Sequence, residues 1–398
     1  MDNSNPEFKE DEDQLELEGD IGCLDQRSFS SAVVSANDWT TETLLNQIDK
    51  GNILLNPDFQ RRDAWDKKRK SKFIESLILG LPIPQVVLAE SKERRGSYIV
   101  LDGKQRLLSI RQFAAERSDP NYEQLKLTGL EIRSDLCRKS LVDLKADLDL
   151  FDDLSAFENQ PIRTVVIKNW PNEEFLYHVF LRLNTGSVPL SPQELRQALH
   201  PGPFVTFLDK ASAQSSALQE ILKLKRPDFR MRDTELLLRY FAFSNFLKQY
   251  GGTLKRFLDE TCEKLNDSWE NNETEIIAQL KSFELAHKCV ESIFEGNQYR
   301  KWNGESYESR FNRAIFDVMV LSFSKAEVRN KAKDKEKEIE DAFKQLCVSN
   351  SEFLASIEST TKSLTSTHAR ISHWFRILND TIDSNLNVPV LEDRRIQW

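Results

Sequence analysis

Five consecutive residues combine side chains that suit phosphate chemistry: Asp102, Gly103, Lys104, Gln105 and Arg106. A carboxylate can hold Mg²⁺ or position a water molecule, and a glycine lets backbone N–H groups approach a ligand closely. An arginine can form two parallel hydrogen bonds to phosphate oxygens. Asp-Gly turns that open helices are also common in purely structural roles, so the spacing alone leaves both interpretations open.

A second group of candidate residues lies in the loop from Pro57 to Trp65. Arg61 and Arg62 stand there between two aromatic residues, a mixture that nucleotide and nucleic-acid sites use for phosphate contacts and base stacking. The aromatic residues equally suit a role as core anchors. We predict a ligand or partner role for the two arginines and a solvated helix face for the basic run 67–70 that follows.

The third group follows a predicted helix near residue 183. Arg182, Asn184 and Thr185 precede a glycine, and their side chains suit hydrogen bonds to a ribose or phosphate, although turns use the same residues. Ser191-Pro192-Gln193-Glu194 then has the pattern of a capping box that opens another helix, which gives Glu194 a local structural role.

The elements that must position these residues follow from the hydrophobic spacing. Helical spacing is expected over 40–50, 66–79, from Lys104 onward and over 172–183. Strands are expected over 84–89, 97–101 and 161–167, with a weak strand over 127–132. The second strand runs directly into Asp102 and Gly103, so the first group of candidates occupies a strand-to-helix junction, where phosphates often bind.

Length and charge define the predicted domains. A chain of 398 residues is too long for one small domain. Residues 1–30 hold ten acidic and two basic side chains, so most of the formal charge of −9 lies there. We predict an acidic disordered tail over 1–36, a domain with a small mixed sheet over 37–200, and an all-helical domain over 201–398.

Several classes of protein are disfavoured by the sequence. There is no apolar run long enough for a membrane span, no secretory signal pattern at Met1, and no regular cysteine spacing for zinc or disulfides. The chain lacks the P-loop and serine-hydrolase motifs, and its five histidines form no metalloprotease motif. We therefore expect a cytoplasmic protein without a membrane partner.

The motifs, taken in order, resemble the N-terminal domain of GmrSD-type modification-dependent restriction endonucleases, a branch of the ParB/sulfiredoxin-like superfamily. The resemblance extends over residues 38–245 and rests on five motifs: Phe59-Gln60-Arg61-Arg62 with Trp65, the run 73–84, Leu101–Leu107, Arg182–Gly186 and Leu190–Arg196. The family's central motif usually reads Asp-Gly-Gln-Gln-Arg, and this chain has Lys104 at its third position. The fold class that the resemblance implies is α+β, with a ParB/sulfiredoxin-like domain before a large helical region.

The resemblance also implies a function. Family members are associated with binding or hydrolysing nucleoside triphosphates and with defence against phage or modified DNA. We accordingly expect a nucleotide-binding, Mg-dependent NTPase component of a prokaryotic restriction system, with catalytic Asp102, Gln105 and Arg106. Phosphate contacts are expected from Arg61, Arg62, Gly103, Lys104, Arg182, Asn184 and Thr185, and Asp102 is the expected Mg²⁺ ligand.

Three alternatives remain open from the sequence. Lys104 favours a sensor that binds a nucleotide or nucleic acid without hydrolysing it. A ParB-like metal-dependent nuclease acting through the same loop is the second, although residues 246–398 lack the His-Asn-His pattern of the nuclease domain that many relatives carry. An interaction scaffold is the third. DNA and a protein encoded in the same operon are further expected partners, and the sequence does not indicate the oligomeric state.

Overall fold

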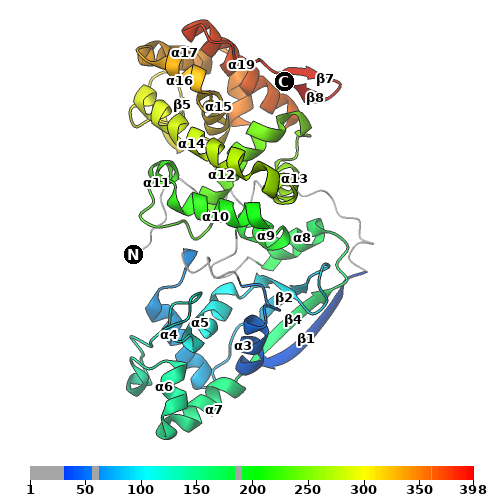
Figure 1. Cartoon of the computed structure of the whole chain (residues 1–398), viewed down its shortest axis with the longest axis vertical. Coiled ribbons are helices and arrows are strands. Elements are labelled where there is room, and N and C mark those ends of the chain that lie inside the picture. Colours follow the sequence, from blue (N-terminus) through cyan, green and yellow to red (C-terminus); the bar gives the residue numbers. More distant parts are fainter. Residues whose placement is uncertain (1–30, 56–61, 184–190, 360) are drawn as a thin grey trace. The chain divides into compact units, whose positions relative to one another are not determined.

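The computed structural model describes residues 31–55, 62–183, 191–359 and 361–398. The described chain up to Leu199, together with Phe229–Met231, forms one compact unit, called here the sheet unit. His200–Asp228 and Arg232–Trp398 form the second, called here the helical unit. Figure 1 labels the elements of both units.

A mixed sheet of four strands organises the sheet unit. The strands are β1 (Val33–Thr40), β2 (Val86–Glu90), β3 (Tyr98–Asp102) and β4 (Pro161–Lys168), in the order β1-β4-β2-β3. The pairs β1–β4 and β2–β3 are antiparallel, whereas β2 and β4 are parallel. The predicted strands near 84–89, 97–101 and 161–167 and the α+β class are therefore confirmed.

Helices α3 to α7 gather on one side of this sheet (Figure 1). Their bounds are α3 Thr41–Asp49, α4 Lys67–Ile78, α5 Lys104–Ala114, α6 Leu141–Ala146 and α7 Phe151–Asn159. Two further helices, α8 (Glu173–Leu183) and α9 (Pro192–Leu199), contact β3. Apolar residues at helical spacing, such as Leu44 and Ile48 on α3, bury one face of each major helix in a common core.

Side-chain caps fix where two of the helices begin. The Thr40 hydroxyl accepts a hydrogen bond from Thr43 N at 3.1 Å, and the Asp66 carboxylate accepts one from Arg69 N at 2.7 Å. Each cap satisfies one of the backbone N–H groups that a helix start leaves without a partner. The predicted starts of α3 and α4 are confirmed within one residue.

Two predictions in this unit are wrong. The segment 127–132 forms no strand, because the Glu75 carboxylate binds the N–H groups of residues 131, 132 and 133 at 3.3, 2.9 and 2.7 Å, in place of a neighbouring strand. The predicted disordered tail ended at residue 36, but β1 begins at Val33 and pairs with β4 along its whole length. Residues 33–36 thus belong to the sheet.

The helical unit contains ten α-helices among its described residues. They are α10 Pro203–Gln214, α11 Ser216–Ile221, α12 Arg232–Phe246, α13 Leu254–Asp267, α14 Trp269–Phe294, α15 Arg313–Phe323, α16 Ala326–Ala332, α17 Glu336–Ser349, α18 Ser351–Glu358 and α19 Leu364–Ile382. The all-helical prediction needs one correction. Two antiparallel hairpins are present, β5 (Arg300–Trp302) with β6 (Tyr307–Phe311) and β7 (Val390–Glu392) with β8 (Arg395–Gln397).

A charged cluster lies inside this unit's apolar core. Arg239 on α12 donates to both carboxylate oxygens of Asp317 on α15, at 2.9 and 2.5 Å. The guanidinium of Arg370 on α19 lies 3.5 Å from the same carboxylate. All three side chains are almost fully buried, and the Asp317 carboxylate joins three helices through its contacts with the two arginines. Over the described residues, no helix has the length and apolar character needed to cross a membrane.

Candidate functional site at the start of helix α5

The backbone at Gly103 separates the end of β3 from the start of α5. Its φ is 95° and its ψ is 11°, in the left-handed region that glycine adopts readily. A Cβ atom at this position would lie 3.0 Å from Val86 Cγ2 and 3.3 Å from Nε and Nη2 of Arg106. Both the dihedral angles and the close packing therefore require glycine here.

Asp102 is held in one orientation but remains accessible. One carboxylate oxygen accepts a hydrogen bond from Gly103 N at 2.7 Å, and the other accepts one from Arg106 Nη2 at 2.9 Å. The side chain is 34% exposed. A carboxylate offers about four lone-pair directions, so these two hydrogen bonds leave capacity for a cation or water.

Arg106 lies beneath the loop and not on its surface. It is 7% exposed, and its Nη2 also donates to the carbonyl of Gln85 at 2.9 Å. The guanidinium thus connects the end of β3, the first turn of α5 and the residue that precedes β2. This geometry favours a positioning role for Arg106 over the predicted fork to phosphate.

Lys104 and Glu194 form a buried ion pair across 90 positions of sequence. The lysine Nζ donates to Glu194 Oε1, and the two side chains are 6% and 7% exposed. The other oxygen of Glu194 accepts a hydrogen bond from Ser191 N at 2.7 Å, while Glu194 N donates to Ser191 Oγ at 3.1 Å. The predicted capping box is therefore present, and its glutamate also binds the lysine of the central motif.

Gln105 connects the central motif to the end of the arginine-containing loop. Its Oε1 accepts a hydrogen bond from Trp65 N at 3.4 Å, so the amide NH₂ is not used in this contact. The ring of Trp65 packs edge-on against Phe73 and receives the guanidinium of Arg69, 4.8 Å from the ring centre. Trp65 thus acts as an anchor for the loop, one of the two roles that its sequence allowed.

Lys70 corrects the prediction that the basic run is a solvated face. Lys67, Lys68 and Arg69 are exposed, but Lys70 is 4% exposed and donates to Asp63 and to Gln112 Oε1, the latter at 2.6 Å. Because Gln112 belongs to α5, Lys70 fastens the loop before α4 to the motif helix. The signal was in the sequence, since Lys70 shares the helix face of Phe73, Ile74 and Leu77.

The remaining predicted residues are placed as follows. Arg62 is 1% exposed, and Arg182 is exposed in the last turn of α8. Arg61, Asn184 and Thr185 lie outside the described residues. The structure therefore brings together parts of three motifs, through Trp65 with Gln105 and Lys104 with Glu194.

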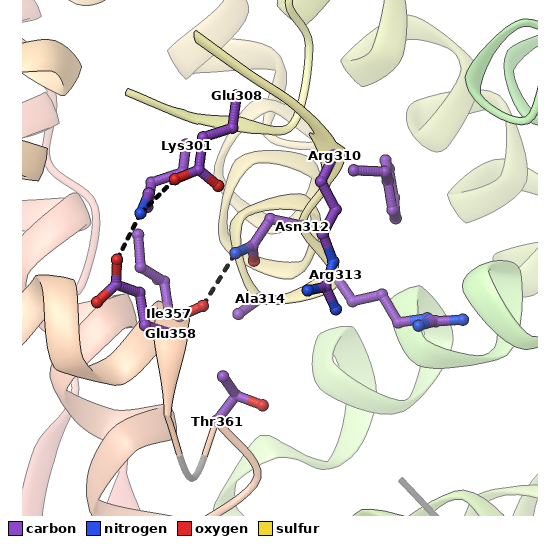
Figure 2. Close-up of a pocket in the computed structure, with 10 residues that line it drawn as sticks. Lys301, Glu308, Arg310, Asn312, Arg313, Ala314, Ile357, Glu358 and Thr361 are labelled. Carbon is purple, nitrogen blue, oxygen red and sulfur yellow. Dashed lines mark hydrogen bonds and ion pairs between the residues drawn. The ribbon is translucent and has the colours of Figure 1, made fainter. Parts of the chain in front are cut away.

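A separate pocket lies within the helical unit (Figure 2). Its volume is about 420 Å³, and Lys301, Arg310, Arg313 and Asn312 are among its lining residues. Lys301 donates to Glu308 and Glu358 at 2.5 Å each, and Asn312 Nδ2 donates to the Ile357 carbonyl at 2.9 Å. Among the predicted site residues that the structure describes, none lines this pocket.

These features define a class of protein: an α+β domain in which a strand ends in a carboxylate, a left-handed glycine follows, and a helix begins. Residues 41–201, less than half of the chain, match the family model described as "GmrSD restriction endonuclease, N-terminal domain". This region is a domain of that family, as its motifs predicted, and the match relates the chain to restriction systems. No curated protein and no solved structure matches the chain significantly.

Proposed function

We propose that the sheet unit binds a nucleoside triphosphate at the loop between β3 and α5 and that it serves a prokaryotic restriction or anti-phage system. The observation that carries the proposal is the conformation of Gly103. At this residue the chain turns and the eleven-residue helix α5 begins. Because glycine has no side chain, residue 103 does not cap the N–H groups of the first helical turn. The first N–H groups of such a helix favour an anion, and phosphate is the anion that comparable loops bind.

The accessible carboxylate of Asp102 fits a role as a Mg²⁺ ligand. Mg²⁺ bound with nucleotides is held by one or two carboxylates, by phosphate oxygens and by water. Asp102 supplies one carboxylate, directed by Gly103 N and Arg106. When bound, Mg²⁺ would neutralise phosphate charge at this loop.

The surrounding residues have distinct proposed roles. Gln105, whose amide NH₂ is left over by the contact with Trp65, binds phosphate or directs a water molecule. Arg106 keeps the Asp102 carboxylate in place. Lys104 supports the loop through its buried ion pair with Glu194. Arg61, Arg182, Asn184 and Thr185 remain candidates for further contacts with the phosphates, and so does Arg62, whose side chain is buried.

The ion pair of Lys104 also supports a second candidate function, a sensor that binds nucleotide without hydrolysing it. The family usually has glutamine at this position, and here the lysine pairs with Glu194. Only a turnover measurement separates the sensor from the NTPase, since both bind through the same loop.

Nucleotide binding is tested first. Titration of the full chain with ATP, GTP, CTP and UTP in Mg²⁺ is expected to give one saturable site for at least one nucleotide. Asp102→Asn should weaken it at least about tenfold, as loss of a group on the bound metal does. The matched control is Asp152→Asn, an exposed aspartate on α7 of the same unit. Binding to none of the four, or equal binding by Asp102→Asn, would refute the proposal.

Turnover is tested next, by phosphate release from the nucleotide that binds. Release above a protein-free blank that Asp102→Asn abolishes favours the NTPase, and binding without release favours the sensor. Incubation of the same samples with plasmid DNA and Mg²⁺ or Mn²⁺ tests the third alternative, since a nuclease acting through this loop would nick the plasmid in an Asp102-dependent manner.

A further inference from the structure

A histidine and two glutamates meet where α11 packs against α14 in the helical unit. Glu220 lies on α11, while His287 and Glu291 lie one turn apart on α14. One ligand atom of each side chain lies within 4.8 Å of those of the other two. His287 Nε2 is 3.1 Å from Glu220 Oε2. Residues from two helices thus present one nitrogen and two carboxylates to a common point.

A contact between Nδ1 and the Tyr299 hydroxyl orients the ring of His287. It is 3% exposed, and its Nδ1 lies 3.1 Å from the hydroxyl of Tyr299, with the two rings stacked at 5.9 Å between centroids. The Tyr299 hydroxyl can donate to Nδ1 or accept from Nδ1–H, depending on the tautomer of the ring. In the structure Nε2–H donates to the Glu220 carboxylate. A bound metal ion would replace this proton at Nε2, and Nδ1–H would then donate to Tyr299, as in metal sites where a neighbouring group holds the second ring nitrogen.

Both glutamates are open to solvent, whereas the histidine is not. Glu220 is 56% exposed and Glu291 is also exposed. An ion can therefore reach the carboxylates from outside and meet the buried nitrogen. Ligand atoms around a Zn²⁺ ion are about 3–4 Å apart, because Zn–N and Zn–O distances are about 2.0–2.2 Å. Small rotations of the two exposed side chains would bring these atoms to that spacing.

We propose that Glu220, His287 and Glu291 bind one divalent transition-metal ion, Zn²⁺ or Mn²⁺, which ties α11 to α14. An imidazole with two carboxylates suits these ions better than Mg²⁺, which prefers oxygen ligands alone. The two helices are already linked by Glu284 of α14, which accepts from Ser215 and Ser216 and, at 3.1 Å, from Ala217 N. The ion would strengthen the same contact one turn farther along α14.

The same unit provides a matched control. His373 on α19 also pairs with a glutamate, its Nε2 lying 2.9 Å from Glu352 Oε2. Within the described ranges no third metal-ligating side chain was found close enough to join that pair. His373 is thus the control for a histidine that only shares a hydrogen bond with a glutamate, whereas His287 belongs to the proposed three-ligand site.

Calorimetric titration of the chelator-treated full chain with Zn²⁺, Mn²⁺ and Mg²⁺, without nucleotide, tests the proposal. We expect one site per chain for Zn²⁺ or Mn²⁺ and weaker Mg²⁺ binding. Glu291→Gln and His287→Gln should each weaken it at least about tenfold, and Tyr299→Phe by about 10–100-fold, the range for loss of an outer-shell partner. His373→Gln should leave it unchanged.

The proposal is overturned if the wild type shows no such site, if Glu291→Gln binds as the wild type does, or if His373→Gln weakens binding equally. Should the buried His287→Gln variant fail to fold, the surface variants Glu291→Gln and Glu220→Gln carry the test, with folding checked by circular dichroism. Amide exchange gives a second readout, because the ion should slow exchange in α11 of the wild type and not of Glu291→Gln.

Discussion

Glu194→Gln should destabilise the sheet unit through the loss of one buried charge. Glutamine at this position can still accept the hydrogen bond from Ser191 N, so the cap of α9 is retained. Lys104, only 6% exposed, would lose the Glu194 carboxylate with which it pairs. Removing one partner of a buried ion pair costs about 3–5 kcal/mol, because the charge that stays buried loses the attraction of its partner.

The complementary change, Lys104→Gln, restores the residue that the family usually carries. A glutamine amide can still donate to Glu194, so we expect a smaller loss, about 1–3 kcal/mol, the range for disturbing a buried hydrogen-bonded group. The double variant pairs two neutral amides. It should be more stable than Glu194→Gln alone, with a coupling of about 1–3 kcal/mol between the two sites.

Amide exchange of the full chain, followed by mass spectrometry of peptides from α5 and α9, measures the loss of stability around the ion pair in each variant. A loss of about 3 kcal/mol corresponds to roughly 150-fold faster exchange, since each 1.4 kcal/mol is a factor of ten. Exchange in the helical unit is the internal reference. Two results would refute the argument that the pair is a coupled buried interaction. Exchange in Glu194→Gln would be as slow as in the wild type, or the losses of stability of the two single variants would simply add in the double variant.

Three further predictions follow from other contacts. Gly103→Ala should lower the free energy of unfolding by about 1–3 kcal/mol, because alanine is strained at φ 95° and its Cβ would crowd Val86 and Arg106. The same variant should also weaken nucleotide binding. A denaturation midpoint equal to that of the wild type would contradict the predicted loss of stability. For Glu75, burial raises the pKa, but hydrogen bonds from three backbone N–H groups outweigh it and the net shift is downward from 4.5. A carboxyl group whose pKa is lowered on folding stabilises the fold fully at pH values above its unfolded-state pKa, and this contribution disappears as the pH falls through the lowered pKa. The amides of residues 131–133 should therefore lose protection against exchange below about pH 4.5 in the wild type. Glu75→Gln should remove this pH dependence. Asp317→Asn would remove the buried carboxylate that pairs with Arg239 and Arg370. It should destabilise the helical unit by about 3–5 kcal/mol, which urea unfolding would detect as a lower midpoint.

Local patterns carried most of the fold. The strands β2, β3 and β4 are short apolar runs between turn residues, and the helices begin at residues that can cap them. The strand β1 escaped prediction because most of its side chains are exposed, so it lacks the alternation of a half-buried strand. The false strand near residue 130 had strand-like composition, but a carboxylate from another element took its N–H groups.

The candidate site was predictable in position but not in its internal contacts. The Asp-Gly motif and the helical spacing after it place the loop at a strand-to-helix junction. The partner of Lys104 could not be predicted, since Glu194 already had a sufficient local role in its capping box. The second acceptor of Arg106, beside Asp102, could not be predicted either, because it is the backbone carbonyl of Gln85, which every residue type provides.

The strand β1 determines where a recombinant version of this domain should begin. The matched region begins at residue 41, directly after β1 ends at Thr40. A protein truncated there would lose an edge strand that pairs with β4 over eight residues, and also the cap of α3. The uncovered row of N–H and C=O groups on β4 would be a template for pairing between molecules. Recombinant pieces that begin at residue 41 should therefore aggregate, whereas those that begin before Val33 should stay monodisperse.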